Sequence, residues 1–360
     1  MIGIIGGYGD IGRKVVESLY LMGHIELLVG SRNKKNFFQN YQSVSYNYVD
    51  LYEEKNIKDF VEKCTMIINC TGLTEGITEK LLYEVQKHKC DYIEPQYNSC
   101  IKKVVTRENN IFVQGVGTMP GLSGVLPIFL KSKFDRLKGI KLYYLGNGTF
   151  TKRSAKDFLD GMNSSDNLAM VRFENGRLIP NSIEENKIIP VFNRCCMMLP
   201  YFDKESQEVC NFLKLEYAEF YMAVKNDLIY RILMKARERY KNNPEQTIED
   251  ICNASKIDYD KNSICGFVIE AEGIVGKTIK QFTLVLKAKE ASTLTGEVIA
   301  VVADFLMREN KKSSNNILSM WEYQVWNEAL AKRINESLRI YMKLYDCSME
   351  ELSKVEEGEI

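Results

Sequence analysis

The chain has 360 residues, of which 45% are hydrophobic and 27% are charged, with 48 basic residues balancing 48 acidic ones. This length predicts two domains rather than one core. Zero formal charge argues against nucleic acid or an anionic membrane surface as a partner, because both attract a surplus of positive charge. The sequence has no apolar run long enough to span a bilayer, so we expect no membrane partner.

Cysteine and histidine usage bears on the compartment and on metals. The ten cysteines form no C-x-x-C pair, and the two histidines, His24 and His88, lie near no convincing set of ligands. The apolar stretch at residues 2–5 is too short for a signal peptide. Scattered cysteines without such a peptide are typical of reduced, mostly buried thiols. We therefore expect a cytoplasmic protein without a metal site.

Short apolar runs alternate with amphipathic segments over the first third of the chain. Expected strands cover residues 2–5, 25–29, 44–49, 66–69, 92–93 and 111–113, and expected helices cover residues 12–22, 54–64 and 78–89. This alternation predicts βαβ units, which build a parallel sheet with helices on both faces. Residues 1–127 therefore predict an α/β, Rossmann-type, doubly wound dinucleotide-binding domain.

The pattern changes after residue 127. Runs at 142–145, 170–173, 187–192 and 197–202 predict strands without regular intervening helices, and Glu-Asn-Gly-Arg at 174–177 predicts a hairpin turn. A second hairpin is expected over residues 264–290, and a long helix over residues 205–240. Residues 128–290 therefore predict a second, α+β substrate domain with an antiparallel sheet.

From residue 291 the sequence predicts helices again, over 293–309 and 317–345. We expect residues 291–345 to return to the dinucleotide-binding domain and residues 346–360 to form a flexible tail. Trp321, Tyr323 and Trp326 lie on the second of these helices. They either cover the first domain or pack across a homodimer.

Four glycines fall within the first turn after the first expected strand. Gly7-x-Gly9-x-x-Gly12 matches the dinucleotide fingerprint, in which the first glycine allows a tight turn and the second allows close approach to a pyrophosphate. The third glycine lets the helix pack against the strand, and the free N–H groups at the start of that helix face the phosphate. The predicted cofactor-binding turn comprises Gly7, Tyr8, Gly9, Asp10, Ile11 and Gly12.

The residue that distinguishes NAD from NADP is expected about 20 positions further on, at the end of the second strand. Ser31 and Arg32 occupy that place, and Lys34 and Lys35 follow. A carboxylate there would bind ribose hydroxyls, whereas a guanidinium grips a 2′-phosphate. The sequence therefore predicts NADP(H) and disfavours a flavin, although a solvated basic loop is the alternative.

Other cofactor contacts are expected at the carboxyl ends of the remaining strands, where ligands collect in open α/β sheets. Asp50 ends the third strand and is placed to face the adenine. Cys70, Thr71 and Gly72 follow the fourth strand beside the expected nicotinamide ribose, and Gly117 follows the sixth. Each of these loops could instead be only a connection.

Five segments resemble the NADP-binding region of the saccharopine dehydrogenase/reductase family. They are GIIGGYGDIGRKVVESL, GSRN, TGLTEG, DYIEP and GVGTMPGLSGVLP, and ASTLTGEVIAVVADFLM at 291–307 is similar to that family's Thr-Gly helix. The resemblance implies a pyridine-nucleotide oxidoreductase that acts on a small-molecule substrate derived from an amino acid. Such enzymes reduce an imine to a secondary amine or catalyse the reverse oxidation.

The resemblance also places residues 92–95 in a loop near the substrate. The family more often has an Asp-containing, Ser-Gly-type segment there, so this chain departs from the pattern. Glu94, Gln96 and Tyr97 are candidates for polar contact or proton delivery, and the alternative is that Glu94 caps a helix. An amino-acid carboxylate would need a cation from the second domain, and the candidates are Lys152, Arg153, Arg172 and Arg177.

Two other functions remain open. A short-chain-type NADP carbonyl reductase needs a Tyr-x-x-x-Lys pair, and Tyr83/Lys87 and Tyr221/Lys225 match by spacing. A non-enzymatic NADP(H)-binding sensor or scaffold would keep the fold without the chemistry. Consumption of NADPH in the presence of an imine would distinguish an imine-reducing enzyme from the carbonyl reductase and from the sensor or scaffold.

Overall fold

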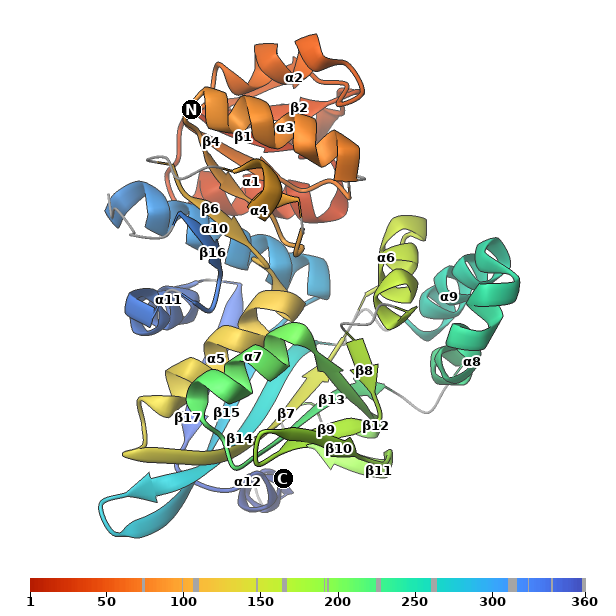
Figure 1. Cartoon of the computed structure of the whole chain (residues 1–360), viewed down its shortest axis with the longest axis vertical. Coiled ribbons are helices and arrows are strands. Elements are labelled where there is room, and N and C mark those ends of the chain that lie inside the picture. The colour runs from red at the N-terminus through yellow and green to blue at the C-terminus, as the bar shows by residue number, and fades with distance from the viewer. Residues whose placement is uncertain are drawn as a thin grey trace. The chain divides into compact units, whose positions relative to one another are not determined.

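A computed structural model describes residues 1–72, 75–98, 100–105, 110–146, 148–163, 167–190, 192, 194–224, 228–259, 264–309, 316–322, 324–337 and 339–357. The chain divides into two compact units (Figure 1). Unit 1 combines Met1–Val125 with Ser292–Ser337, and unit 2 combines Leu126–Ala291 with Leu338–Ile360. Among the described helices, none has both the length and the apolar character needed to cross a membrane.

Unit 1 is built on a seven-stranded parallel sheet with the order β16-β6-β5-β4-β1-β2-β3. Its strands are β1 (Ile2–Ile5), β2 (Leu27–Ser31), β3 (Val44–Tyr48), β4 (Met66–Asn69), β5 (Asp91–Ile93), β6 (Phe112–Gln114) and β16 (Ile317–Ser319). The first six correspond to the expected strands and follow the order of a doubly wound dinucleotide fold. The predicted fold class is therefore confirmed.

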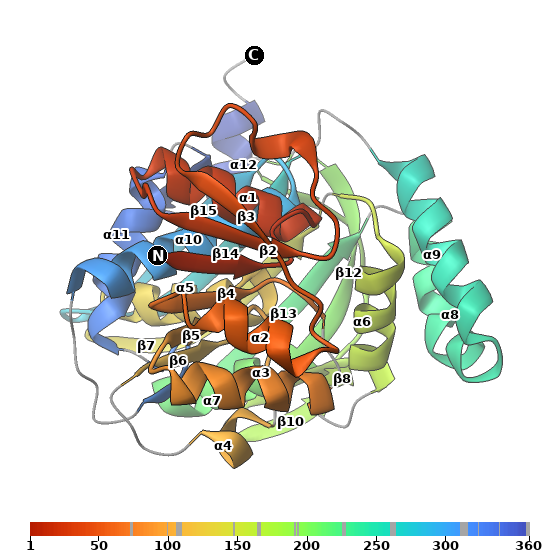
Figure 2. The same ribbon diagram turned by 90° about the horizontal axis from the view of Figure 1, so that it is seen from above.

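Helices cover both faces of this sheet, because alternate residues of each strand point to opposite sides. They are α1 (Asp10–Leu21), α2 (Glu54–Val61), α3 (Glu75–Lys87), α4 (Ile101–Val104), α10 (Ala291–Glu309) and α11 (Gln324–Glu336). Ile5 and Ile67 pack with Phe60 of α2 and Leu82 of α3. The opposite face carries α1, and Figure 2 shows α1 and α3 on opposite sides of β1 and β4.

Helix α10 lies close against α1 within unit 1. A Cβ on Gly296 would lie 2.4 Å from the Cβ of Lys14, so only glycine permits this approach without a shift of α1. One turn away, the Ser18 hydroxyl donates to the buried carboxylate of Glu297 at 2.5 Å. The Thr-Gly segment thus braces the helix that follows the glycine-rich turn.

Unit 2 holds a mixed ten-stranded sheet with the order β10-β9-β13-β7-β14-β15-β17, joined at its side by β11, β12 and β8. Its strands are β7 (Arg136–Leu145), β8 (Asn167–Ala169), β9 (Val171–Glu174), β10 (Arg177–Pro180), β11 (Glu184–Ile189), β12 (Arg194–Asp203), β13 (Tyr217–Val224), β14 (Cys265–Val275), β15 (Thr278–Ala288) and β17 (Ile340–Tyr345). The antiparallel pairs β9–β10 and β14–β15 confirm both expected hairpins. β13 and β7 are parallel, which the sequence did not indicate.

The remaining helices are α5 (Ser123–Lys131), α6 (Lys152–Asn163), α7 (Lys204–Leu213), α8 (Leu228–Asn242), α9 (Pro244–Asp258) and α12 (Met349–Glu357), and two short helical turns are η1 (Asn36–Phe38) and η2 (Thr118–Leu122). α6, α8 and α9 enclose a small core of their own, which contains Leu159, Leu233 and Ile251. α12 packs Met349 and Leu352 on the sheet face.

The expected long helix over 205–240 is wrong. Lys214 adopts a left-handed conformation (φ 54°) that ends α7, and Tyr217–Val224 then forms β13, whose side chains alternate between buried and half-exposed. A strand with this alternation has a period of two rather than 3.6 residues. Only the two ends of the expected helix, which α7 and α8 cover, are helical as predicted.

The C-terminal expectations also need correction. The expected helix over 317–345 is instead β16, α11 and β17, and β17 pairs with β15, so it belongs to unit 2. The expected flexible tail forms helix α12, because Met349 and Leu352 are apolar residues that the sheet of unit 2 buries. Residues 358–360 of that tail lie outside the described residues.

Candidate functional site

The glycine-rich turn links β1 to α1 by a very close backbone approach. Gly6 has a positive φ of 78°, and its carbonyl accepts the N–H of Gly9 at 2.9 Å. A Cβ on Gly12 would lie 2.3 Å from the Gly6 oxygen and 2.7 Å from the Cα of Gly7. Both neighbours are backbone atoms that cannot move away cheaply, so this turn requires glycine at position 12.

The first turn of α1 presents backbone donors. Gly9 is the N-cap and has no side-chain cap, and the first intrahelical bond runs from the Arg13 N–H to the Gly9 carbonyl at 2.9 Å. The N–H groups of Asp10, Ile11 and Gly12 therefore have no partner within the helix. Such donors, with the positive end of the helix dipole, favour a bound anion.

The end of β2 carries positive charge. Ser31 and Asn33 form a local turn, in which the Ser31 hydroxyl donates to the Asn33 carbonyl at 3.2 Å. Arg32, Lys34 and Lys35 are exposed, and no ion pair involves any of the three within the described part of the chain. The position that holds a carboxylate in NAD sites therefore holds an uncompensated guanidinium.

Tyr8 contributes its backbone to the turn and its side chain to an aromatic cluster. Its buried ring stacks on Phe38, with centroids 5.6 Å apart, and also contacts Phe37 at 6.2 Å and Tyr46 at 6.1 Å. Burial raises the pKa of Tyr8 above its ordinary value. The ring therefore connects the glycine-rich turn to the segment that follows β2.

Asp50 and Cys70 have local explanations in the structure. The Asp50 carboxylate accepts the backbone N–H of Tyr52 at 3.1 Å, which stabilises the turn before α2. Burial raises the pKa of Cys70 to about 12, so its side chain is a neutral thiol. Both follow strands of the sheet, at its carboxyl edge. A cofactor contact for either stays a prediction.

A chain of buried hydrogen bonds joins the ends of β4 and β5. The Thr71 hydroxyl donates to Asn69 Oδ1 at 2.5 Å, Asn69 Nδ2 donates to the Tyr92 hydroxyl at 2.9 Å, and that hydroxyl donates to Glu94 Oε2 at 2.9 Å. In each of these bonds the acceptor is the group nearer to Glu94, so Glu94 is the final acceptor of the chain. Gly72, the next residue of the loop after β4, is half-buried.

Glu94 itself is the most unusual group of this edge. Its side chain is 4% exposed, and its second oxygen, Oε1, is buried with no hydrogen-bond partner among the residues described. Burial raises the pKa of Glu94 to about 7, although hydrogen bonds from Tyr92 and Asn69 oppose the shift. The carboxyl accepts from a tyrosine and caps no described helix, so the capping alternative is not supported.

Gln96 and Tyr97 lie further along the same loop, with exposed side chains. The Gln96 carbonyl accepts the N–H of Gly115 at 3.2 Å, and the Tyr97 ring covers Gly115, where a Cβ would lie 2.7 Å from its Cζ. These contacts join the loop after β5 to the loop after β6. Proton delivery by either side chain stays a prediction.

Gly117 begins the turn η2 after β6. A Cβ there would lie 3.2 Å from the Pro120 carbonyl, and the next hydroxyl, that of Thr118, bonds Thr295 of α10 at 2.8 Å. The Thr-Gly helix therefore reaches the carboxyl edge of the sheet as well as α1.

Sequence reasoning missed Asn69, Tyr92 and Thr295. The available signal was a polar residue at the end of an otherwise apolar strand.

The candidate cations for a substrate carboxylate are mostly already paired. Lys152 bonds Glu249 at 3.0 Å, Arg153 bonds the aspartate one turn further on at 3.0 Å, and Arg172 bonds Glu174 at 3.1 Å. Arg177 is exposed on β10. The structure therefore gives no reason to prefer the first three for binding a carboxylate.

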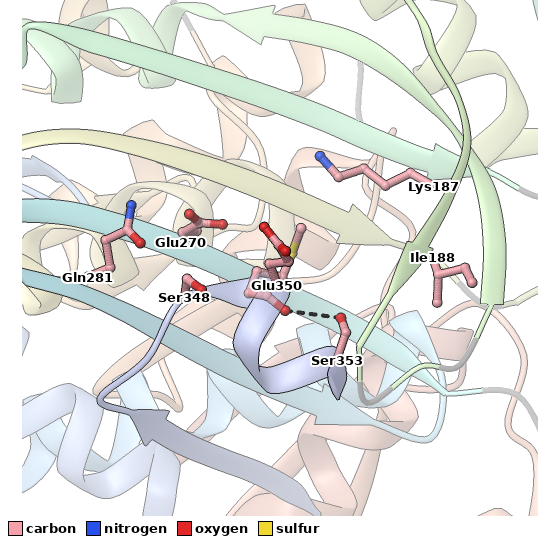
Figure 3. A pocket seen from close by; sticks show the side chains of 8 residues that line it. Lys187, Ile188, Glu270, Gln281, Ser348, Glu350 and Ser353 are labelled. Carbon is pink, nitrogen blue, oxygen red and sulfur yellow. Dashed lines mark hydrogen bonds between the residues drawn. The ribbon is translucent and has the colours of Figure 1, made fainter. Parts of the chain in front are cut away.

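Unit 2 contains a cavity of 460 Å³ between β11, the β14–β15 hairpin and α12 (Figure 3). Its main polar groups have partners: Lys187 donates to the Tyr143 hydroxyl at 2.7 Å, and Ser353 donates to the Met349 carbonyl at 3.0 Å. Glu270 accepts the Met349 N–H, and burial raises its pKa. Of these bonds, the one between Glu270 and Met349 holds α12 on the sheet, and none of them defines a ligand site. Within the described ranges, no group of His, Cys, Asp or Glu side chains is arranged to hold a metal ion.

The Tyr-x-x-x-Lys matches find little support. Tyr83 is 61% exposed on α3, and Tyr221 lies on β13 in unit 2, while Lys225 lies outside the described residues.

Trp321 is buried within unit 1, whereas Tyr323 and the side chain of Trp326 are not among the described parts. A homodimer stays a prediction.

No protein-family model and no curated protein matches this sequence. Saccharopine dehydrogenase (L-Glu forming) from Saccharomyces cerevisiae, in its apo form, matches with a TM-score of 0.73 at 11% identity, over 96% of this chain and 99% of its own. Homospermidine synthase from Legionella pneumophila, in complex with NAD, matches with a TM-score of 0.57 at 11% identity, over 95% of this chain and 91% of its own. The chain therefore has the fold of saccharopine dehydrogenase and homospermidine synthase, in which a Rossmann-type parallel sheet accompanies a mixed sheet.

Proposed function

We propose that this chain is an NADP(H)-dependent oxidoreductase that acts on a carbon–nitrogen bond of an amino-acid-derived substrate. The observation that carries the proposal is the turn at residues 6–12, where uncapped N–H groups lie beside a backbone approach that only glycine allows. The fold of saccharopine dehydrogenase, matched over nearly the whole chain, supports chemistry at such a bond.

The residues at the end of β2 support the phosphorylated form of the cofactor. The uncapped N–H groups of α1 suit the diphosphate, and Arg32 with the Ser31 hydroxyl suits a 2′-phosphate. The homospermidine synthase was solved with NAD, whereas this chain lacks the carboxylate that would hold the ribose hydroxyls. We therefore expect NADPH to bind more tightly than NADH.

Glu94 is the proposed proton-holding residue. The reduced nicotinamide supplies the hydride, so the protein must orient the substrate, exclude water and provide a proton. With a pKa near 7, Glu94 holds a proton at neutral pH for part of the time, which suits general acid catalysis. Its buried Oε1 has no partner among the described groups, so a hydrogen bond to the substrate nitrogen would satisfy it. Asn69 and Tyr92 hold the other oxygen in place.

The proposal is tested by following the absorbance of NADPH with a panel of imines, formed by mixing lysine and other amines with 2-oxo acids. We expect consumption with at least one amine–oxo acid pair and none with either component alone, because the imine is the substrate. Consumption with a ketone or aldehyde alone would indicate a carbonyl reductase instead. Tight NADPH binding without consumption across the panel would indicate a sensor or scaffold.

A further inference from the structure

Cations surround the aromatic cluster at the end of β2, and one of them comes from α1. The Arg13 guanidinium lies over the Phe37 ring at 5.2 Å, and the Lys35 ammonium lies 5.5 Å from the same ring centroid. Lys34 lies 5.8 Å from the Tyr46 ring, whose hydroxyl donates to the Ser31 carbonyl at 3.0 Å. The helix after the glycine-rich turn thus adds a guanidinium to the predicted 2′-phosphate region.

Positive charge exceeds negative charge around this cluster. Glu17 lies 3.7 Å from Arg13 and 3.9 Å from Lys14, so one carboxylate faces two cations. Arg32 and the lysines that follow it form no ion pair within the described ranges. The Arg13 Nε is buried and has no hydrogen-bond partner among the groups described. An anion with several oxygens would compensate the excess of positive charge.

Tyr8 explains why Arg13 reaches this region. Its ring packs on Phe38 and Phe37, and a backbone hydrogen bond from Lys35 reaches its hydroxyl. The glycine-rich turn and the segment after β2 are therefore held together before any ligand binds. A guanidinium stacked on a ring keeps its N–H edge available for a phosphate.

We propose that Arg13 is a second guanidinium of the 2′-phosphate site and that, with Arg32, it determines the preference for NADPH over NADH. This inference rests on the proposed function and adds a specificity residue from α1. The phosphate oxygens accept N–H groups from Arg32 at the end of β2 and from Arg13 on the helix side. Tyr8 is a positioning residue, because it acts only through the packing of the segment 32–38.

The test compares calorimetric titrations of the full chain with NADPH, NADH and 2′,5′-ADP. Arg13→Met keeps an unbranched apolar side chain beside Phe37 while the charge is lost, and Arg13→Lys restores the charge. We expect R13M to weaken NADPH and 2′,5′-ADP about 10-fold or more, which is about 1.4 kcal/mol, and to change NADH less than about twofold. R13K should recover part of the loss. Lys87→Met is the matched control, because Lys87 also lies over a ring and in an ion pair, and it should change none of the three.

The outcomes separate this inference from the proposed function. An unchanged ratio of NADPH to NADH affinity in R13M, with Arg32→Ala still lowering that ratio, would overturn the role of Arg13 alone. Equal weakening of both nucleotides in R13M would also overturn it, because a merely structural contact would act on both. Failure of the unmodified chain to bind either nucleotide would instead refute the proposed function.

Discussion

Alanine at position 12 is expected to weaken NADPH binding by at least about 100-fold, or roughly 2.8 kcal/mol at 1.4 kcal/mol per factor of ten. The new Cβ would lie 2.3 Å from the Gly6 carbonyl oxygen, so the turn must open away from α1 and the donors for the diphosphate separate. Overpacking of this kind also costs about 1–3 kcal/mol of folding free energy. Calorimetry with NADPH measures the first effect, and thermal unfolding without nucleotide measures the second.

Alanine substitutions at two other glycines, Gly9 and Gly76, are expected to weaken NADPH binding less than Gly12→Ala. At Gly9 the nearest atom to an added Cβ is the Gly6 oxygen at 3.2 Å, so Gly9→Ala should weaken NADPH less than Gly12→Ala. Gly76 is exposed in the first turn of α3 with nothing within 4 Å of an added Cβ, so Gly76→Ala should leave NADPH binding unchanged. A folded G12A protein that binds NADPH like the unmodified chain would contradict the proposed role of the turn.

Glu94→Gln is the second change with a large expected effect. It keeps the shape of the side chain and removes its titration, so kcat for imine reduction should fall about 10²–10⁴-fold. The pH dependence of kcat near pH 7 should also disappear, because the group with a pKa of about 7 is gone. NADPH affinity should stay within about twofold, since Glu94 is proposed to act on the substrate. An unchanged pH profile would exclude Glu94 as the proton-holding group.

The same variant has a signature in stability. The folded-state pKa of Glu94 is about 7 against an ordinary value of 4.5, so the folded chain keeps a proton that the unfolded chain releases. The free energy of unfolding therefore falls as pH rises from about 4.5 to about 7, by roughly 3 kcal/mol, because each tenfold change in proton affinity corresponds to about 1.4 kcal/mol. Gln has no such loss, so E94Q should match the unmodified chain near about pH 4.5 and be more stable near about pH 8. Denaturant unfolding at both pH values checks this, and equal stability at the higher pH would contradict the burial argument.

The parallel sheet of unit 1 was predictable because its central strands, β1 and β4, are short, buried along their whole length and nearly all apolar. Met66–Asn69 is an example, with every residue buried. The glycine-rich turn was predictable for a different reason: each glycine answers a local steric demand that the motif spacing encodes. Neither depends on contacts distant in the sequence.

The wrong secondary-structure predictions fall on segments whose conformation depends on contacts with residues distant in the sequence. Tyr217–Val224 continues an apparent helix in the sequence, but pairing with β7 on one side and β12 on the other makes it a strand. Residues 346–360 were expected to form a flexible tail, yet two apolar side chains, those of Met349 and Leu352, anchor α12 on the sheet of unit 2. Ile317–Ser319 was too short to recognise without its partner β6.

The hydrogen-bonded chain that ends at Glu94 shows what sequence reasoning can and cannot give. Glu94 was a candidate because of its place after β5. Its partner Asn69 follows from the register of β4 and β5, in which Ile67 faces Tyr92 and Ile68 faces Ile93, so that residue 69 comes beside residue 94. No sequence pattern specifies that register.

The central claim, that unit 1 binds a pyridine dinucleotide through the glycine-rich turn and prefers the phosphorylated form, is tested most directly by calorimetric titration of the purified full chain with NADPH and with NADH. We predict saturable heat with NADPH and an affinity for NADH at least about 10-fold weaker, a difference of about 1.4 kcal/mol. No heat with either nucleotide would contradict the claim, and equal affinities would contradict the assignment of the 2′-phosphate site.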